Sequence, residues 1–347
     1  MPTIESFRQG DRSAIEHLYR RVFGADMAEA NRLRWDWQYT RNPNNPATGP
    51  LIWIAREGPA IIGQYATMPV RTRVLGADVD AAWGMDVMVA PERQRQGLGE
   101  ILFGTWDTNV GASLGLGLSE GSFRLFKKLR WPNVGPVPCL VKPLTRRAFR
   151  HPKWPTPINR LIGALAYPVV KVVARARPLR GETTTTRQFD ERFTALWDRV
   201  KDRFAFAVRR DAAYLQWKYI WPPHVRYTIA TVSRDDEVVG YAVYRHAREP
   251  RGKVTLLVDF LTDPTDDAAF DTLVRFVDRA ARDADSDKIR TFCLDQRFRT
   301  MLRRNGYFEV ASTMEFVAKI NAFSVGEAFY TDTGTWHVTL GDSDQDR

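Results

Sequence analysis

The sequence has few of the residues that build covalent cross-links or metal centres. Its two cysteines, Cys139 and Cys293, are too few for a disulfide framework or a zinc cluster, and they are typical of a reducing cytosol. The five histidines show no ligand spacing such as His-Glu-x-x-His, so we expect no protein-bound metal. The N-terminus has no apolar signal core, and no apolar run reaches the roughly 20 residues of a membrane-spanning helix. These absences exclude a disulfide-rich secreted protein and an integral membrane protein, and they predict a cytoplasmic location.

Net positive charge is confined to one segment. The formal net charge of the 347 residues is +10. Residues 141–187 hold eleven lysines and arginines against a single acid, Glu182, while the rest of the chain is balanced. A nucleic-acid-binding face needs aromatic residues between its bases, and only Trp154 and Tyr167 lie in this segment. We therefore expect no nucleic-acid partner.

What the chain does have is a set of sequence elements that occurs twice in the same order. With 44% hydrophobic residues and a prior of roughly 150 residues per domain, two folded domains are expected. The matched pairs are Trp37-x-Tyr39 with Pro43 and Trp217-x-Tyr219 with Pro223, the hairpins 52–65 and 228–244, the strands 85–91 and 258–264, and the helix ends 125–134 and 301–310. The order predicts a tandem duplication.

The predicted fold class is α/β, with an α+β mixed sheet in each half, because helices and short strands alternate within both halves. We expect a first domain at 1–140, a basic connector at 141–187, a second domain at 188–322 and an extension at 323–347. The last part of this extension, 331–347, is polar in composition, which predicts a frayed tail.

The strongest chemical signal is a glycine-containing turn between a strand and a helix. The apolar run 83–90 is stopped by Pro91, and a polar turn follows before Gly97 and Gly99 open an apolar helix. Glycines allow a ligand to approach the backbone, and the unpaired amides of a helix start attract an anion. With arginines in the turn, this arrangement suits a diphosphate. A tight turn that binds nothing is the alternative.

Two other phosphate-binding loops fit less well. The lysine of a Walker loop is absent, and Leu102 stands where a dinucleotide fingerprint has its third glycine. The segment Gln94–Gly99 instead resembles the [Q/R]-x-x-G-x-[G/A] motif of the GNAT acyltransferase superfamily. The triplet Val87–Val89 resembles the family's fourth-strand L-x-V, and 125–131 resembles its late Y-x-x-x-G-F element. The resemblance covers 1–140 in element order and 188–322 more weakly.

This resemblance implies a site for acetyl-CoA or another acyl-CoA. Strand four would splay from strand five, and the main chain of strand four would pair with the pantetheine arm. The amides of the glycine turn would hold the diphosphate, and the acyl group would pass directly from the thioester to an amine. The implied coenzyme-binding residues are Val87, Met88, Val89, Gln94, Arg95, Gln96, Gly97, Leu98 and Gly99.

Three residues are candidates for the proton transfer that an amine nucleophile requires: Asp86, Ser119 and Glu120. Asp86 lies on the strand itself. The alternative interpretation is structural, with the carboxylate accepting hydrogen bonds from neighbouring donors. Ser119 and Glu120 follow an apolar run, and a helix cap is the alternative there. The resemblance implies a tyrosine as proton donor for the leaving thiolate, but this sequence has Phe126 at that position.

The second half lacks the glycine turn. Ala268 and Phe270 lie in the corresponding region, with Asp263, Asp266, Asp267 and Asp271 around them. Carboxylates repel a diphosphate, and larger side chains prevent close approach. We therefore expect no coenzyme in this half, which would shape the acceptor pocket or support the first half.

Two further features have a structural and a functional interpretation. The tryptophan and tyrosine of each repeat are core anchors or acceptor-site aromatics. Residues 158–180 of the connector form an inter-domain segment or a peripheral membrane contact on anionic lipid.

The sequence thus predicts a cytoplasmic N-acyltransferase whose acceptor is a small-molecule, sugar or peptide amine. A catalytically impaired CoA sensor or scaffold, and an aminoacyl transferase of the peptidoglycan-bridge type, are the alternatives.

Overall fold

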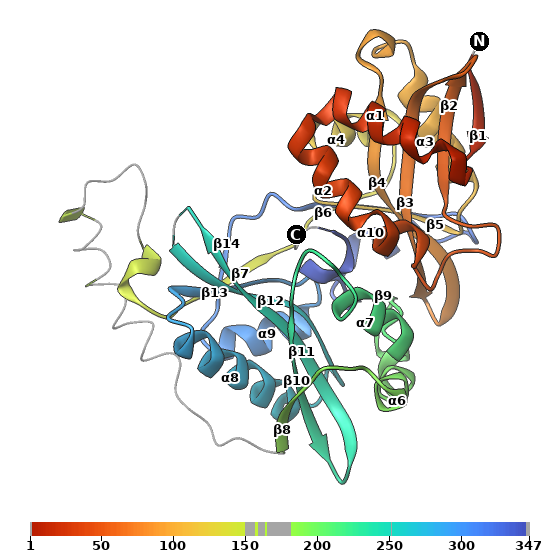
Figure 1. The fold of residues 1–347 in the computed structure, drawn as a ribbon. Helices are drawn as coiled ribbons and strands as arrows, with labels where there is room; N and C mark the ends of the chain where they lie inside the picture. The colour runs from red at the N-terminus through yellow and green to blue at the C-terminus, as the bar shows by residue number, and fades with distance from the viewer. Residues whose placement is uncertain (1, 150–156, 159–163, 165–181, 251, 345–347) are drawn as a thin grey trace. The chain divides into compact units, whose positions relative to one another are not determined.

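The structure is a computed structural model that describes residues 2–149, 157–158, 164, 182–250 and 252–344 (Figure 1). The chain forms two compact units, and neither is continuous in sequence. Unit 1 contains 1–135, 221–225 and 315–331, and unit 2 contains 136–220, 226–314 and 332–347. Most of the predicted connector, including the membrane-contact segment, lies outside the described residues.

Unit 1 is a mixed sheet with helices packed against it. Its strand order is β1 (Thr3–Ser6), β2 (Ile52–Glu57), β3 (Ala60–Val74), β4 (Ala77–Val89), β5 (Ala112–Leu116), β15 (Glu315–Ile320) and β6 (Asn133–Pro136). The helices are α1 (Arg12–Phe23), α2 (Ala25–Trp35) with a π-helical turn at Asp36–Thr40, α3 (Leu98–Thr108), α4 (Glu120–Lys128) and α10 (Glu327–Thr331). Strands β4 and β5 are parallel and β1–β4 are antiparallel, which confirms the predicted mixed sheet.

Aromatic side chains form much of the core of unit 1. Phe103 and Trp106 of α3 contact Phe126 and Trp131, with ring centroids between 4.6 and 6.5 Å apart. Tyr65 of β3 stacks on Trp106 at 4.8 Å. Such pairs stabilise a core beyond the area they bury, so α3 is held firmly on the sheet.

Unit 2 has a second mixed sheet. Its strand order is β14 (Phe308–Val310), β7 (Cys139–Pro143), β13 (Lys288–Phe292), β12 (Gly252–Thr262), β11 (Glu237–Glu249), β10 (Thr228–Arg234) and β8 (Glu182–Thr186). The helices are α6 (Glu191–Val200), α7 (Ala212–Tyr219), α8 (Asp267–Asp283) and α9 (Gln296–Arg304). Two short strands, β9 (Phe206–Val208) and β16 (Trp336–His337), pair in parallel. Helix α8 packs on β10, β11 and β12.

Each sheet contains one strand from the other half of the sequence. Strand β15 lies between β5 and β6 in unit 1, and β7 lies between β13 and β14 in unit 2. The side chain of Lys319 on β15 pairs with Asp107 of α3, and Asn321 donates to the Asp107 main-chain oxygen at 2.7 Å. The compact units therefore do not follow the predicted boundaries at 140 and 322, because two strands are exchanged.

The frayed tail predicted for 331–347 is wrong for its described part. Residues 336–344 are buried in unit 2. Leu294 donates its main-chain N–H to Val338 at 3.0 Å, and Cys293 and Thr339 form an antiparallel bridge. The polar composition of this segment wrongly suggested exposure to solvent, because its acids have buried partners. Over the residues that the structure places, no helix is long and apolar enough to cross a membrane.

Candidate active site

The candidate site of unit 1 lies where two parallel strands separate. Strands β4 and β5 pair only at Ala81–Ala112, Ala82–Ser113 and Trp83–Leu114. Beyond Trp83, β4 continues to Val89 with β3 as its partner, while β5 pairs with β15. Among the described strands, none therefore pairs with one side of the second half of β4. The splay implied by the family resemblance is present.

A β-bulge redirects the side chains of β4 at the start of this opening. Thr67 faces Gly84, but Tyr65 faces Val87, so β4 has one residue more than β3 in this interval. A bulge reverses which face the following side chains occupy, and bulges are common beside active sites. Gly84 faces α3, since an added Cβ would lie 3.0 Å from the Trp106 ring. Asp86 instead contacts Tyr19 of α1.

The main chain after the bulge offers polar groups to the opening. The N–H of Ala90 donates to the Ile62 carbonyl of β3 at 2.8 Å. Because successive residues of a strand direct these groups to opposite sides, the N–H and C=O of Val87 and Val89 point away from β3. The side chain of Gln94 donates to the Val89 oxygen at 3.2 Å and ties the end of β4 to the turn. Met88 is buried and contributes to the core.

The glycine turn presents unpaired main-chain donors. Gly97 is the N-cap of α3 and has a left-handed backbone with φ +82°, which favours glycine. Glu100 and Ile101 donate to the Gly97 carbonyl at 3.0 and 3.2 Å, which starts the helix. Among the described residues, no acceptor lies within hydrogen-bond distance of the N–H groups of 95–99. An added Cβ at Gly97 or Gly99 would meet no heavy atom within 4 Å, so the space above these amides is open.

The arginines around the turn have different partners. Arg93 pairs with Glu57 of β2, and Arg21 pairs with Glu92 at 2.7 Å. Arg95 is exposed, has φ +62°, and forms no ion pair with any residue of the described ranges. It is therefore a cation that remains available at the mouth of the turn, next to the unpaired amides.

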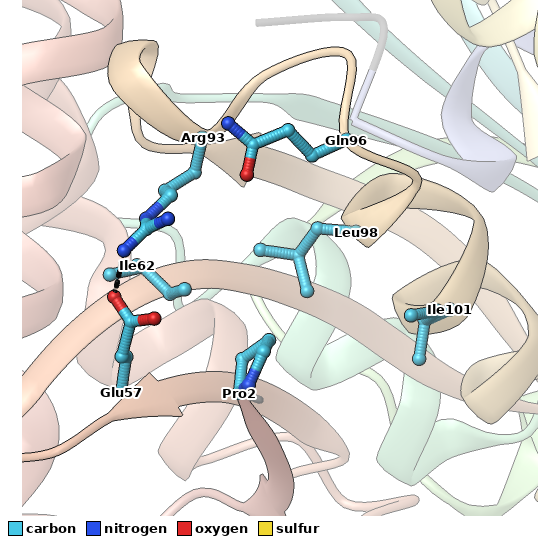
Figure 2. Close-up of a pocket in the computed structure, with 7 residues that line it drawn as sticks. All are labelled: Pro2, Glu57, Ile62, Arg93, Gln96, Leu98 and Ile101. Atoms are coloured by element: carbon cyan, nitrogen blue, oxygen red, sulfur yellow. Dashed lines mark hydrogen bonds and ion pairs between the residues drawn. The ribbon is translucent and has the colours of Figure 1, made fainter.

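A small cavity of about 280 Å³ adjoins the turn (Figure 2). Figure 2 shows Arg93 and Gln96 above it, Leu98 and Ile101 of α3 beside it, and the ion pair between Arg93 and Glu57 at its edge. Its lining residues are Pro2, Glu57, Ile62, Arg93, Gln96, Leu98 and Ile101.

Asp86 lies in a buried network of neutral donors. Its carboxylate accepts hydrogen bonds from Tyr39 at 2.6 Å, Asn31 at 2.9 Å and Tyr19 at 3.1 Å. Burial, followed by the adjacent Asp86 carboxylate, raises the pKa of Tyr39 well above its ordinary value, so its hydroxyl stays protonated. The core interpretation of Tyr39 is correct, since it is fully buried. No sequence signal pointed to Tyr19 or Asn31, because their part in the network depends on how α1 and α2 pack on β4.

The other two candidates lie after β5. Ser119 is the N-cap of α4 and accepts from the Ser122 N–H at 3.2 Å, which fits the helix-cap interpretation. Glu120 is exposed and pairs with Arg124 at 3.1 Å. Within the described ranges, no hydrogen bond joins either residue to Asp86.

The position of the family's tyrosine is occupied by a core residue. Phe126 is 3% exposed and its ring lies 4.6 Å from Phe103 and 4.8 Å from Trp131. Arg130 adopts φ +55°, the left-handed conformation that favours glycine, at the position where the resembling family has glycine. The backbone of this element is kept although its residue types differ.

Unit 2 contains the same backbone features, but its opening is filled. Strands β12 and β13 pair only over Val254–Leu256, and a bulge at Val258 precedes the buried Asp259. Residues 337–343 lie against this opening: His337 Nε2 donates to the Phe260 oxygen at 2.8 Å, and Thr339 donates to Asp259 at 2.9 Å. The chain itself therefore occupies what is open in unit 1.

The turn of unit 2 is also satisfied internally. The side chain of Asp266 caps α8 by accepting from Ala269 at 3.0 Å, and Arg234 pairs with this carboxylate at 2.6 Å. Asp263 accepts from the Thr265 N–H at 2.9 Å. Carboxylates thus accept hydrogen bonds from two main-chain amides of this turn, whereas the amides of 95–99 in unit 1 have no such partner among the described residues.

Comparison with known proteins shows which domain model and which fold this chain matches. The family model described as "Acetyltransferase (GNAT) domain" matches residues 3–110. A probable N-acyltransferase of unknown function from Enterococcus faecalis V583 is 12% identical over 93% of this chain and 73% of its own, with a TM-score of 0.62. A GCN5-related N-acetyltransferase from Anabaena variabilis is 14% identical over 92% and 73%, with a TM-score of 0.56.

A third similar structure is Saccharomyces cerevisiae N-myristoyltransferase with bound myristoyl-CoA. It is 14% identical over 91% of this chain and 82% of its own, with a TM-score of 0.55. No curated protein sequence matches significantly. These structural likenesses extend over both units and establish the fold, and the family model identifies the domain in residues 3–110. Residues 3–110 therefore match a GNAT acetyltransferase domain, and the chain as a whole has the fold of these acyltransferases.

Proposed function

We propose that unit 1 binds an acyl-CoA, with acetyl-CoA as the first candidate, and transfers the acyl group directly to an amine. The observation that carries this proposal is the row of unpaired N–H groups at 95–99, continuous with the exposed main chain of Val87 and Val89. Helix-start amides and the free guanidinium of Arg95 suit a diphosphate. The open side of β4 suits an amide-containing arm that pairs like a strand.

In the proposed reaction, the amine nitrogen attacks the thioester carbon, and the carbon–sulfur bond breaks to release the CoA thiolate. The N–H of Val89 is directed into the opening and would stabilise the negative charge that develops on the thioester oxygen. Since a thioester is already activated, positioning of the two reactants contributes much of the acceleration. The amine loses one proton and the thiolate gains one, so the step balances without another reactant.

The route of that proton involves the candidate residues Asp86, Ser119 and Glu120. Asp86 has three of its acceptor sites occupied by neutral donors, which leaves its negative charge without a cation in the described network. This charge would favour an ammonium group nearby, so we assign Asp86 to the acceptor side. Phe126 cannot donate a proton, and the thiolate would take its proton from water or from the attacking nitrogen, which loses a proton as it becomes the amide nitrogen.

The experiment compares two glycines that have the same backbone φ. Gly97 and Gly76 both have φ +82°, in the left-handed region that favours glycine, and both have open space around an added Cβ, so valine introduces φ strain at either position. We expect Gly97→Val to weaken CoA binding at least ~tenfold in calorimetry, because the side chain covers the amides. Gly76→Val is the matched control and should bind CoA like the wild type.

Turnover separates the enzyme from its rivals. Acetyl-CoA with a panel of amines should release free thiol in the wild type and not in Gly97→Val. Binding without thiol release across the panel would support a CoA sensor, in agreement with Phe126. Activity with aminoacyl-tRNA that survives in Gly97→Val would support the aminoacyl transferase alternative. No CoA binding by the wild type would refute the proposal.

A further inference from the structure

Two buried glutamines of unit 1 have side-chain atoms without hydrogen-bond partners. Gln38, in the π-helical turn, is fully buried, and neither its amide oxygen nor its amide nitrogen has a partner among the described residues. Gln64 of β3 donates to the Asp86 main-chain oxygen at 3.3 Å, but within the same ranges its buried amide oxygen has no partner. Most buried polar groups are paired, and π-helical turns are frequent at functional sites. The unpaired atoms therefore point to a ligand.

The unpaired oxygen of Gln64 lies on the same face of the sheet as Asp86. The preceding residue, Gly63, faces α3, since an added Cβ would contact Leu98 and Leu102. Successive residues of a strand alternate between faces, so Gln64 faces the side on which Asp86 contacts α1 and α2. The carboxylate and the amide oxygen are both acceptors, which suits an ammonium group with its several N–H donors.

Unit 2 shows what binds at the position of Gln38. In the repeated Trp-x-Tyr motif, Lys218 is the counterpart of Gln38. The Lys218 ammonium donates to the main-chain oxygen of Ser343. The next residue, Tyr219, lies so close to Gly341 that an added Cβ there would overlap its hydroxyl. This position of the motif thus contacts the peptide segment that fills the opening of unit 2.

We propose that the acceptor of unit 1 is a peptide-like amine, an inference that rests on the proposed function. Its ammonium would contact the Asp86 carboxylate and the Gln64 oxygen. The adjoining amide would pair with Gln38, whose side chain can donate to a carbonyl and accept from an N–H. Tyr39, the residue after Gln38, donates to Asp86 at 2.6 Å, so the two parts of this site are neighbours. Gln38 and Gln64 are then specificity-determining residues for the acceptor.

The first test compares two amines on the wild-type chain. Glycinamide has an amide next to its amine, whereas 2-methoxyethylamine has a similar size and no amide. With acetyl-CoA, kcat/KM for thiol release, referred to the same concentration of unprotonated amine, should be at least about tenfold higher for glycinamide. An amine without the amide leaves Gln38 unpaired in the complex, and sites built for hydrogen bonding discriminate strongly against such analogues.

The second test replaces the unpaired amide. Gln38→Met keeps the side-chain length and removes no side-chain hydrogen bond to the described residues, so the variant should fold. We expect KM for glycinamide to rise about tenfold, while KM for 2-methoxyethylamine stays at the wild-type value. Gln9→Met, at an exposed glutamine of unit 1, is the control and should change neither.

Binding of glycinamide to the CoA-bound chain, measured by calorimetry, gives a readout without turnover. Its affinity should fall by the same factor in Gln38→Met and stay unchanged in Gln9→Met. Equal effects of Gln38→Met on both amines, or a wild type with no preference for glycinamide, would overturn the inference and assign a buried water to Gln38. A wild type that releases no thiol with either amine contradicts the proposed function instead, and glycinamide binding then still decides the acceptor class.

Discussion

The two units share the same backbone features and differ in the side chains and segments that surround them. Both have a pair of parallel strands that splay after three residue pairs, a bulge, and a buried aspartate after it. In unit 1 the carboxylate of Asp86 is bound by neutral donors and the neighbouring turn keeps its amides free. In unit 2 the carboxylate of Asp259 is bound by Arg210 and Thr339, and the turn is capped by Asp266.

The difference shows how one backbone plan is completed in two ways. Unit 2 satisfies the polar groups around its opening from within the chain, through the segment 337–343. In unit 1, no described residue accepts a hydrogen bond from the N–H groups of the turn 95–99. Unsatisfied amides cost stability when they are buried, and in unit 1 they are exposed at the turn, where water serves until a ligand replaces it.

The largest expected effect comes from breaking the charged network of unit 2. Arg210 is 1% exposed in its side chain and pairs with Asp342 at 2.9 Å and Asp259 at 3.1 Å. Arg210→Met would leave two buried carboxylates without a cation, which costs about 3–5 kcal/mol of unfolding free energy. Asp86→Asn in unit 1 removes no ion pair and should cost about 1 kcal/mol.

Hydrogen exchange followed by mass spectrometry measures the protection of the main-chain amides in both variants, with peptides assigned to each unit. Protection should be lost in unit 2 for Arg210→Met and should change only slightly in unit 1 for Asp86→Asn. A double variant that also carries Asp342→Asn should recover part of the loss, since one negative charge is gone. Equal costs in the two units would contradict the distinction between charged and neutral networks.

Acid should destabilise unit 2 through His337. Burial, followed by the Arg210 charge, lowers the pKa of His337 from 6.5 to about 3. Below pH 6.5 the unfolded chain binds a proton that the folded chain does not, so the free energy of unfolding falls as pH falls. For one proton the slope is at most about 1.4 kcal/mol per pH unit. Denaturant unfolding between pH 7.5 and 4.5 measures this slope, in an interval above the pH at which most carboxylates titrate.

The variant His337→Phe removes this titrating group, so the free energy of unfolding should depend less on pH over that interval. Its ring can keep the stacking with Phe204, whose centroid lies 5.0 Å away. An unchanged pH slope in this variant would show that other groups control the acid response.

A smaller effect should follow from crowding the segment that fills the opening of unit 2. A Cβ on Gly341 would lie 2.3 Å from the Tyr219 hydroxyl and 3.2 Å from the Asp259 Cβ. Gly341→Ala should therefore cost about 1–2 kcal/mol and increase exchange in 336–343. Gly326→Ala, where an added Cβ meets nothing within 4 Å, is the control. Unaltered exchange in 336–343 would mean that this segment tolerates displacement.

The sequence predicted the features that are local in the chain. The strand, Pro91, the glycines and the helix start stand within a short interval, and each has a local physical reason, so the turn and the mixed fold could be anticipated. The aspartates of the second half indicated that its turn would not offer amides to an anion. That Asp266 caps the helix could be seen only once the structure placed Arg234 and Ala269 beside it.

What the sequence did not predict depends on contacts between distant segments. The partners of Asp86 come from residues 19, 31 and 39, and no spacing rule brings them together. The polar segment 336–344 was expected to fray because its acids look solvent-exposed until Arg210 is placed beside them. The exchange of β7 and β15 between the two sheets could not be predicted, since pairing with a strand from the other half of the sequence has no local signature.

The exchange of β7 and β15 sets an order on biosynthesis. As the chain leaves the ribosome, the sheet of unit 1 stays incomplete until residues 315–320 emerge, because β15 must insert between β5 and β6. Until then, the nascent chain carries an exposed strand edge that invites aggregation. A fragment that stops after the first repeat would therefore contain an unfinished sheet, because unit 1 needs residues 315–320 to complete it.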